Sequence, residues 1–386
     1  MSALVDRERL AHTFMRLCEI DSPSRSEGVV AAYLRELFLE LGATAVIEDG
    51  SAMLTGADCG NLLVRFPGTD PKGQPLFFAC HMDTVQPGVG VEVQRLDDLF
   101  TSRGETVLGG DDKSGIAALI ELIRVLQEEG AAYGPIELLL TTCEEIGLLG
   151  AKAFDCGQIR AAYGYALDST GIDRVIIGAP AANKLKVQVR GIAAHAGLNP
   201  EQGISALCLA AKAIGELRLG RLDEQSTANF GLIRGGVATN IIPDLIILEG
   251  EVRSHSPEKL AAYTREIEEV FVQVVNGWMS PDDLALARPV LEFSAEAEYP
   301  VMRLDVGTPV LERLRRAGEI LDRPLDFCMA GGGSDANIFT SHGLATAIVA
   351  TGMNKVHTTD ECLALDDLVS LTQLLHAIVI PYPAEI

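Results

Sequence analysis

Two adjacent glutamates at the end of an apolar run constrain this sequence more than any other feature. The run Ile136–Cys143 (IELLLTTC) has the length and composition of a buried strand, and Glu144 and Glu145 follow it directly. Two neighbouring carboxylates cannot both enter a dry core, because an unpaired buried charge is strongly destabilising. A positive group must therefore lie close to the end of this strand.

Other parts of the chain supply more side chains of the kind that bind metals, most of them at or just after an apolar run. They are His81 with Asp83, the pair Asp111 and Asp112, Asp168, and His357. Mixed imidazole and carboxylate ligands suit zinc, and suit manganese or cobalt less strongly. This set could supply the ligands of a two-metal hydrolytic site, with one of the two glutamates free to act as a base.

Each of these residues alone has a simpler interpretation. His81 fits a satisfied histidine at a strand end, and His357 fits a surface histidine in a polar loop. Asp111 and Asp112 fit the acidic first turn of a helix, where the macrodipole favours negative charge. A turn would accommodate Asp168. The joint pattern, at strand ends and loops of one predicted sheet, favours the metal site.

Asp83 is placed to orient a metal-bound His81. Residues two apart in an extended chain point the same way. A metal-bound imidazole usually gives its second N–H to a carboxylate, which fixes its tautomer. We therefore expect Asp83 to lie beside His81 without binding the metal itself.

Length and charge narrow the class of protein. The 386 residues favour two domains. The net charge of −23 argues against nucleic acid or an anionic membrane as a partner. The eight cysteines show no paired spacing, so we expect a reducing compartment, the cytoplasm. The charged start has no apolar signal core, and no apolar stretch is long enough to span a membrane.

Periodicity predicts an α/β fold with a mixed, largely parallel sheet, helices on both faces, and an inserted ferredoxin-like α+β lid domain. The expected helices are Ser26–Leu41 (with Ser26 as N-cap), Ser114–Glu129, Ile204–Leu217, Pro257–Val275 (with Ser256 as cap) and Pro309–Leu321. The expected domains are residues 1–182 and 299–386 for metal binding, and residues 183–298 for the lid. The active site should lie at the carboxyl ends of the parallel strands.

Five segments carry a resemblance to a known family. They are His81–Val85 (HMDTV), Gly110–Lys113 (GDDK), Glu144–Gly147 (EEIG), Ala166–Asp168 (ALD) and Val356–Thr358 (VHT). In this order they resemble the dimetal exopeptidases, a family that includes peptidase T, carboxypeptidase G, succinyl-diaminopimelate desuccinylase and aminoacylase. The resemblance spans nearly the whole chain.

Within that family the chain is most similar to the peptidase-T-like members. The similarity rests on the GDDK segment, on Ala238–Pro243 (ATNIIP) and on Gly331–Asn337 (GGGSDAN). One departure is visible: Met329 and Ala330 stand where peptidase T proper carries an arginine.

The resemblance implies a role for each matching position. Asp111 would bridge two divalent metal ions, His81 and Asp168 would complete one metal position, and Glu145 and His357 the other. Glu144 would be the general base. The resemblance also implies a cis peptide bond between Asp111 and Asp112.

Further residues are implied to act on the substrate. His195 would steady the oxyanion, usually in the active site of the partner subunit, which implies a homodimer through the lid. Asn240 and Arg253 would hold a substrate carboxylate. Gly332 and Gly333 would bind substrate from their glycine-rich loop.

The leading hypothesis is a two-metal hydrolase that removes the N-terminal residue from short peptides. Glu144 would activate a water, since a positioned carboxylate can take a proton and pass it to the leaving amine. One alternative is an amidohydrolase, or acylase, acting on N-acyl amino acids. Another is a non-catalytic binding protein on the same fold.

Overall fold

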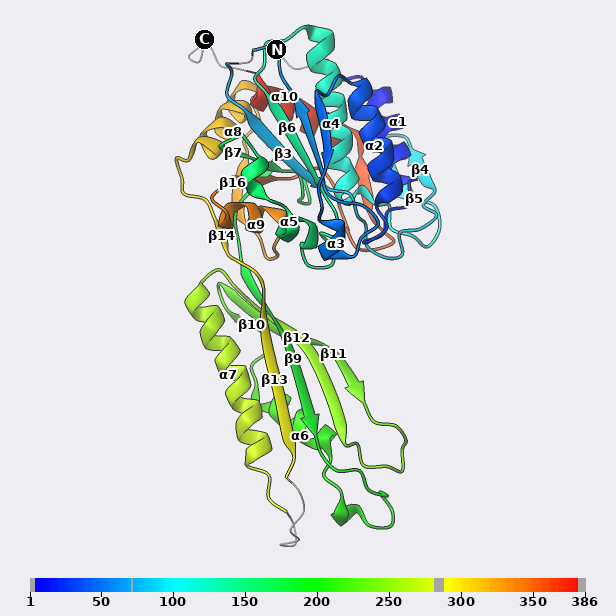
Figure 1. Cartoon of the computed structure of the whole chain (residues 1–386), viewed down its shortest axis with the longest axis vertical. Helices are drawn as coiled ribbons and strands as arrows, with labels where there is room; N and C mark the ends of the chain where they lie inside the picture. Colours follow the sequence, from blue (N-terminus) through cyan, green and yellow to red (C-terminus); the bar gives the residue numbers. More distant parts are fainter. Residues whose placement is uncertain (1–3, 71, 281–287, 381–386) are drawn as a thin grey trace. The chain divides into compact units, whose positions relative to one another are not determined.

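The computed structural model describes residues 4–70, 72–280 and 288–380. The chain folds into two compact units (Figure 1). The discontinuous unit comprises Met1–Ala179 and Met302–Ile386, and the inserted unit comprises Pro180–Val301. Each unit has its own sheet.

The discontinuous unit is built on a nine-stranded sheet in the order β1-β2-β6-β3-β7-β16-β8-β14, with β15 also paired to β8. The strands are β1 (Ala45–Glu48), β2 (Leu62–Phe66), β3 (Leu76–His81), β6 (Ile136–Thr141), β7 (Tyr163–Ala166), β8 (Arg174–Ala179), β14 (Met302–Arg303), β15 (Asp326–Met329) and β16 (Ala345–Val349). The four central strands β6, β3, β7 and β16 pair in parallel, whereas β1, β2 and β14 pair antiparallel. The predicted mixed, largely parallel sheet is confirmed.

Helices cover both faces of this sheet. Every residue of β3, β6 and β7 is buried, which requires cover on each side. The helices are α1 (Arg7–Cys18), α2 (Gly28–Glu40), α3 (Ala52–Thr55), α4 (Gly110–Glu129), α5 (Leu149–Ala153), α8 (Pro309–Ile320), α9 (Asp335–Ser341) and α10 (Leu365–Val379). Helices α1, α4 and α10 pack on one another beside the sheet (Figure 1).

One predicted helix start is wrong. We expected Ser26 to cap the helix that begins there, but α2 begins at Gly28 and Glu27 occupies the cap position. The carboxylate of Glu27 makes no capping hydrogen bond. It is buried and accepts from the amides of the nearby Arg25 and the distant Cys143.

The parallel centre brings three strand ends to one edge. The strands β3 and β7 approach closely at Gly164, which lies opposite Phe77. A Cβ atom at Gly164 would lie 2.2 Å from the carbonyl oxygen of Phe77, so only glycine allows this pairing. As a result, the residues after His81, Thr141 and Ala166 emerge side by side.

A small sheet that the sequence did not reveal supports the C-terminal part of the unit. Its order is β17-β5-β4, from β4 (Val93–Leu96), β5 (Leu99–Ser102) and β17 (Cys362–Ala364). The strand β17 follows directly on the loop that carries His357. This sheet therefore fixes one end of that loop.

The inserted unit is an antiparallel sheet in the order β10-β11-β12-β9-β13, packed against two helices. Its elements are β9 (Ala181–Arg190), α6 (Ala206–Glu216), β10 (Gly220–Asp223), β11 (Ser226–Gly235), β12 (Leu245–Ser254), α7 (Pro257–Asn276) and β13 (Val290–Tyr299). Leu185, Val187 and Val189 of β9 are buried, and the residues between them are not. The predicted ferredoxin-like insertion is confirmed, as is the Ser256 cap, whose hydroxyl accepts from the amide of Lys259.

In the described residues, no helix combines the length and the apolar character that crossing a membrane requires.

Candidate active site

The strand ends of the discontinuous unit bring the predicted metal ligands together. They line a hollow of about 350 Å³ with the predicted base and part of the glycine-rich loop. The predicted residues among its lining are His81, Asp111, Glu144, Glu145, Asp168, Gly332, Gly333 and His357. Residues separated by more than 270 positions in the sequence thus share one cavity.

Asp111 lies at the centre of this group. Its Oδ1 lies 3.1 Å from Nε2 of His81, and its Oδ2 lies 3.3 Å from Nε2 of His357. The two carboxylate oxygens therefore face two different imidazoles. The predicted cis peptide bond between Asp111 and Asp112 is present.

The ligand atoms form two groups that share Asp111. One group is His81, Asp111 and Asp168, and the other is Asp111, Glu145 and His357; within each, the ligand atoms lie within 4.8 Å of one another. Each group combines imidazole nitrogen with carboxylate oxygen, the donor set of a divalent-metal position. The residues present fit two cations joined by one carboxylate.

The two glutamates after β6 differ in their contacts. Oε1 of Glu145 lies 3.0 Å from Nε2 of His357, which places Glu145 in the second group. Glu144 instead lies near His81 and Glu145 and is 9% exposed. This difference fits one ligand and one base. The geometry alone also allows Glu144 to approach a cation.

The buried carboxylates of this cluster disfavour one another's ionised form. Burial, followed by the negative charge of Asp111, raises the pKa of Asp168 to about 7. Burial and the charge of Asp168 likewise raise the pKa of Glu144 well above its ordinary value. Divalent cations would relieve this repulsion, so the electrostatics favour metal binding.

The neighbouring carboxylates raise the pKa of both histidines. Hydrogen bonds with Asp111 and Glu145 raise the pKa of His357 to about 10. Burial opposes the charge on His81, but its contacts with Asp111 and Asp83 outweigh burial and raise its pKa.

Asp83 does more than the sequence indicated. Nδ1 of His81 lies 2.9 Å from the carbonyl oxygen of Asp83 and 3.5 Å from its carboxylate. The Asp83 carboxylate also accepts hydrogen bonds from the amides of Glu144 at 2.9 Å and Glu145 at 3.2 Å, and from the Ser24 hydroxyl at 2.7 Å. Asp83 thus ties the base and one ligand to the loop that orients His81.

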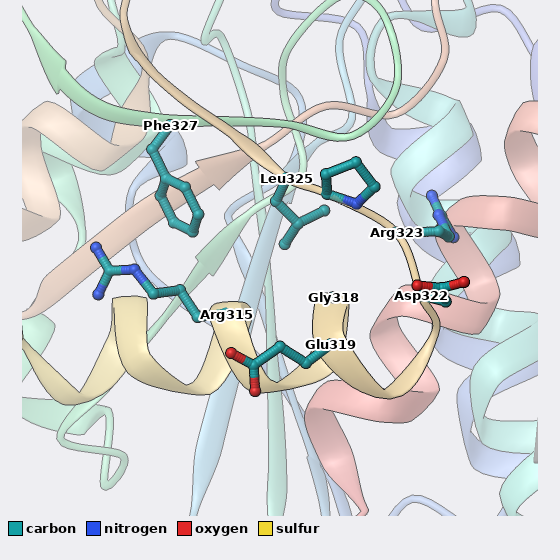
Figure 2. A pocket seen from close by; sticks show the side chains of 8 residues that line it. Arg315, Gly318, Glu319, Asp322, Arg323, Leu325 and Phe327 are labelled. Atoms are coloured by element: carbon teal, nitrogen blue, oxygen red, sulfur yellow. The ribbon is translucent and has the colours of Figure 1, made fainter.

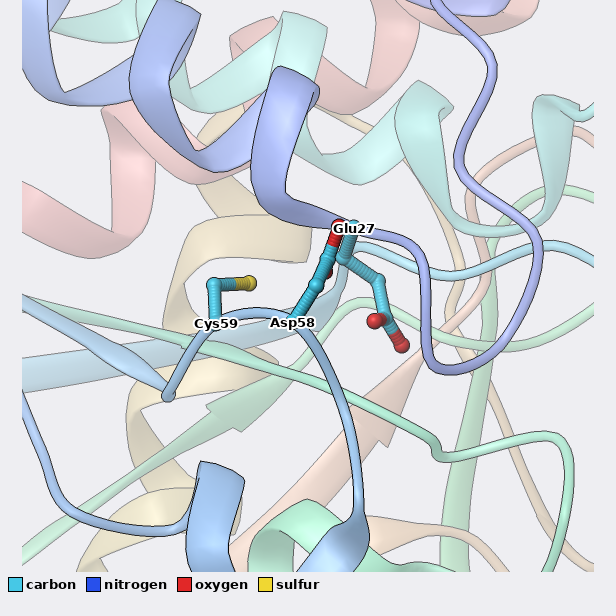
Figure 3. A group of neighbouring side chains, drawn as sticks. All are labelled: Glu27, Asp58 and Cys59. Atoms are coloured by element: carbon cyan, nitrogen blue, oxygen red, sulfur yellow. The ribbon is translucent and has the colours of Figure 1, made fainter.

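Glu27 supports the same turn from the other side. Its Oε1 accepts from the amide of Cys143 at 2.9 Å, directly before the two glutamates. Glu27 also belongs to a separate acidic group with Asp58 and Cys59 (Figure 3). In that group Asp58 accepts from the amide of Gly28, at the start of α2. Oε1 of Glu27 accepts backbone hydrogen bonds, whereas its Oε2 is buried and has no hydrogen-bond partner among the described residues.

The glycine-rich loop adds one buried acid that the sequence analysis missed. Ala330 and Ser334 line the hollow together with Gly332 and Gly333, between β15 and α9. Next in sequence, Asp335 accepts a hydrogen bond from the Thr141 hydroxyl at 2.5 Å, at the end of β6. Burial raises its pKa to about 6. Its position in a GGGSD segment was the available signal.

A second hollow, of about 490 Å³, lies beside α8 in the same unit (Figure 2). The two arginines there have partners of their own: Arg315 pairs with Glu312, and Arg323 pairs with Asp173. None of the predicted site residues lines it.

The three predicted residues of the inserted unit do not form one cluster. His195 and Asn240 are neighbours, because His195 bridges to Ile241 and the Ala196 amide donates to the carbonyl of Asn240. Both are exposed. Arg253 pairs with Ala182 at the opposite end of the sheet, where it contacts Glu251.

The distance between those two places is substantial. The strand β12 runs from Leu245, beside the loop that carries Asn240, to Arg253. At the rise of an extended strand, the distance from Leu245 to Arg253 is about 26 Å. Within one chain, Asn240 and Arg253 therefore cannot both bind the same small carboxylate.

Comparison with known proteins agrees with this site. Residues 77–380 match the model of peptidase family M20/M25/M40. The chain belongs to this family, and the predicted resemblance is confirmed. It is therefore a metal-binding hydrolase, a metal-dependent exopeptidase, and not a non-catalytic binding protein.

Two solved structures and one further protein are similar over almost the full length. Aminopeptidase PepT from Bacillus cereus is 38% identical, with a TM-score of 0.86 and coverage of 97% of this chain and 98% of the other. A tripeptidase from Staphylococcus aureus is 33% identical, with a TM-score of 0.91 and the same coverage. The uncharacterised protein YqjE of Bacillus subtilis is 38% identical over 97% of this chain and 99% of its own length.

We expect metal binding at neutral pH to release protons. A bound metal needs neutral imidazole and ionised carboxylate, whereas the pKa of His357 is raised to about 10 and that of Asp168 to about 7. Apparent affinity should therefore rise with pH across this range. Calorimetric titration with Zn²⁺ at pH 7, in two buffers of different ionisation enthalpy, measures the release.

The variant His357→Ala is the control for this measurement. It should release about one proton fewer, because that imidazole is missing. Equal binding heats in both buffers for the wild-type chain would contradict the expectation.

Proposed function

We propose that this enzyme is a two-metal aminopeptidase that removes the N-terminal residue from short peptides. The observation that carries the proposal is the placement of Asp111 between His81 and His357, one oxygen to each. The similarity to an aminopeptidase and a tripeptidase at 38% and 33% identity supports the choice of substrate.

The residues of the cluster have complementary roles in this proposal. His81, Asp111 and Asp168 would hold one cation, and Asp111, Glu145 and His357 would hold the other. Two such cations would lower the pKa of a water between them and stabilise the charge that develops on the peptide carbonyl oxygen.

Glu144 transfers the proton of the attacking water in this proposal. Asp83 fixes the backbone that carries Glu144, because the Asp83 carboxylate accepts from the Glu144 amide at 2.9 Å. Glu144 takes a proton from the attacking water and passes it to the amine that leaves. Gly332 and Gly333 offer a surface without side chains along which the substrate can lie.

We propose zinc as the metal, with manganese or cobalt as alternatives, because two imidazoles and three carboxylates suit zinc first. The cytoplasm is the proposed compartment. It is supported by eight cysteines that carry no disulfide, four of them buried.

A free α-amine should be required. An aminopeptidase cleaves a tripeptide with a free N-terminus, and acetylation of that amine should abolish turnover. Chromatography of the released residue, on matched free and acetylated tripeptides, measures the difference. If N-acyl amino acids are hydrolysed and free tripeptides are not, the enzyme is an acylase.

Glu144→Gln should keep both metals and lose about 10²–10⁴-fold in turnover, because general-base work contributes that much. The matched variant Glu145→Gln removes the same charge from the neighbouring position and should lose metal instead. Elemental analysis and steady-state kinetics on both variants separate base from ligand. A Glu144→Gln enzyme close to wild-type activity would refute the mechanism.

We propose a homodimer through the inserted unit, with His195 acting in the partner's site. Beyond Ala228, β11 pairs on one side only among the described residues, and Leu232 and Ile233 are 50% and 58% exposed beside that edge. Such an edge favours pairing with a second chain. Asn240 and Arg253 could then approach one substrate carboxylate from two chains.

Subunit complementation tests this arrangement. A chain with His195→Ala and a chain with Glu144→Gln are each expected to be inactive. Mixed under conditions of subunit exchange, they should regain activity, because one site then combines an intact Glu144 with an intact His195. A mixture that stays inactive after confirmed exchange places His195 in its own subunit's site, or outside catalysis.

A further inference from the structure

The loop that carries His357 is closed at its base. The amide and carbonyl of Asn354 pair with those of Cys362, both at 3.0 Å. From Cys362 the chain continues into β17, which is paired to β5. The base of the loop is therefore fixed by the small sheet, and the His357 side chain, 51% exposed, lies in between.

One buried side chain connects this loop to Asp111. Glu361 is 2% exposed. Its Oε2 accepts from the amide of Gly109 at 2.8 Å and its Oε1 from the amide of Asp111 at 3.1 Å. Its own amide donates to the carbonyl of Thr358, the residue after His357, at 3.1 Å. Glu361 thus links the backbone of Asp111 to the turn that carries His357.

The fit around this carboxylate is close. A Cβ atom on Gly110 would lie 3.1 Å from Oε1 of Glu361, so the turn wraps tightly around the acid. Both carboxylate oxygens accept from backbone N–H groups. A glutamine would turn its NH₂ group toward one of these donors and leave that donor unsatisfied.

We propose that Glu361 is a positioning residue that sets the spacing between Asp111 and His357 and so forms the second metal position. This inference rests on the proposed two-metal site. The first metal position is the one formed by His81, Asp111 and Asp168. It depends less on Glu361, because His81 ends β3 and Asp168 follows β7, and these two strands pair directly. Loss of Glu361 should therefore weaken the second position selectively.

A simpler role would produce a different pattern. Gly109 and Asp111 lie at the start of α4, so a carboxylate could bind their amides only to stabilise that helix end. Asp111 belongs to both metal positions, and a helix cap alone would affect both alike. Selectivity between the two positions is what separates the two roles.

The test is a titration of the chelator-treated full chain with Co²⁺, followed by calorimetry and visible absorption. In Glu361→Gln, the second equivalent should bind about 10–100-fold more weakly, the range for residues that orient metal ligands. The first equivalent should change by less than about threefold. Asp360→Asn is the matched control: it removes an equal charge from an exposed neighbour in the same loop and should bind both equivalents as wild type does.

Glu361→Asp provides a second variant should Glu361→Gln fail to fold. It keeps the charge but is one methylene too short to reach both amides, so the same selective loss is expected. The inference is overturned if the variant binds both equivalents equally more weakly, or if it binds both as wild type does. It is also overturned if the wild-type chain binds only one cation. The titration reads metal binding alone, so a wild-type chain that binds two cations without cleaving peptides would refute the proposed function only.

Discussion

The Asp111 carboxylate between two imidazoles is the contact on which the rest of this site depends. One oxygen faces His81 and the other faces His357, although these histidines are 276 positions apart. A carboxylate placed in this way is the shared member of two ligand groups. The parallel centre of the sheet makes the contact possible, because it delivers His81, the two glutamates and Asp168 to one edge.

Buried carboxylates also build the scaffold around that contact. Asp83 accepts the amides of both glutamates, Glu27 accepts the amide just before them, and Glu361 accepts the amide of Asp111. The turn that carries Glu144 and Glu145 and the turn that carries Asp111 are thus each held by acids from distant parts of the chain. A loop whose amide donates to a buried carboxylate has few alternative positions, since moving it away would leave a buried donor or acceptor without a hydrogen bond, which is destabilising. This scaffold places acidic groups densely around a cavity that favours cations.

The sequence was sufficient for the sheet, the inserted ferredoxin-like unit and the group of residues that meets at the strand ends. The sheet and the inserted unit were predicted from apolar periodicity. The group of site residues was predicted from polar side chains at strand ends, at one helix start and in one loop, and the role of each residue came from the family resemblance. Glu361 could not be found in this way, because nothing in the segment His357–Cys362 distinguishes it from exposed Asp360. Ser26 is not the cap, because α2 begins two residues later, at Gly28, and Glu27 occupies the cap position. The separation of Asn240 and Arg253 depends on strand register, which the sequence does not state.

The central claim, two cations sharing Asp111, is tested most directly by anomalous diffraction from crystals of the zinc-loaded enzyme at the zinc absorption edge. The account predicts two peaks in the discontinuous unit. One should lie among His81, Asp111 and Asp168, and the other among Asp111, Glu145 and His357, each within bonding distance of one Asp111 oxygen. A single peak in a fully loaded crystal, or two peaks of which only one contacts Asp111, would contradict it.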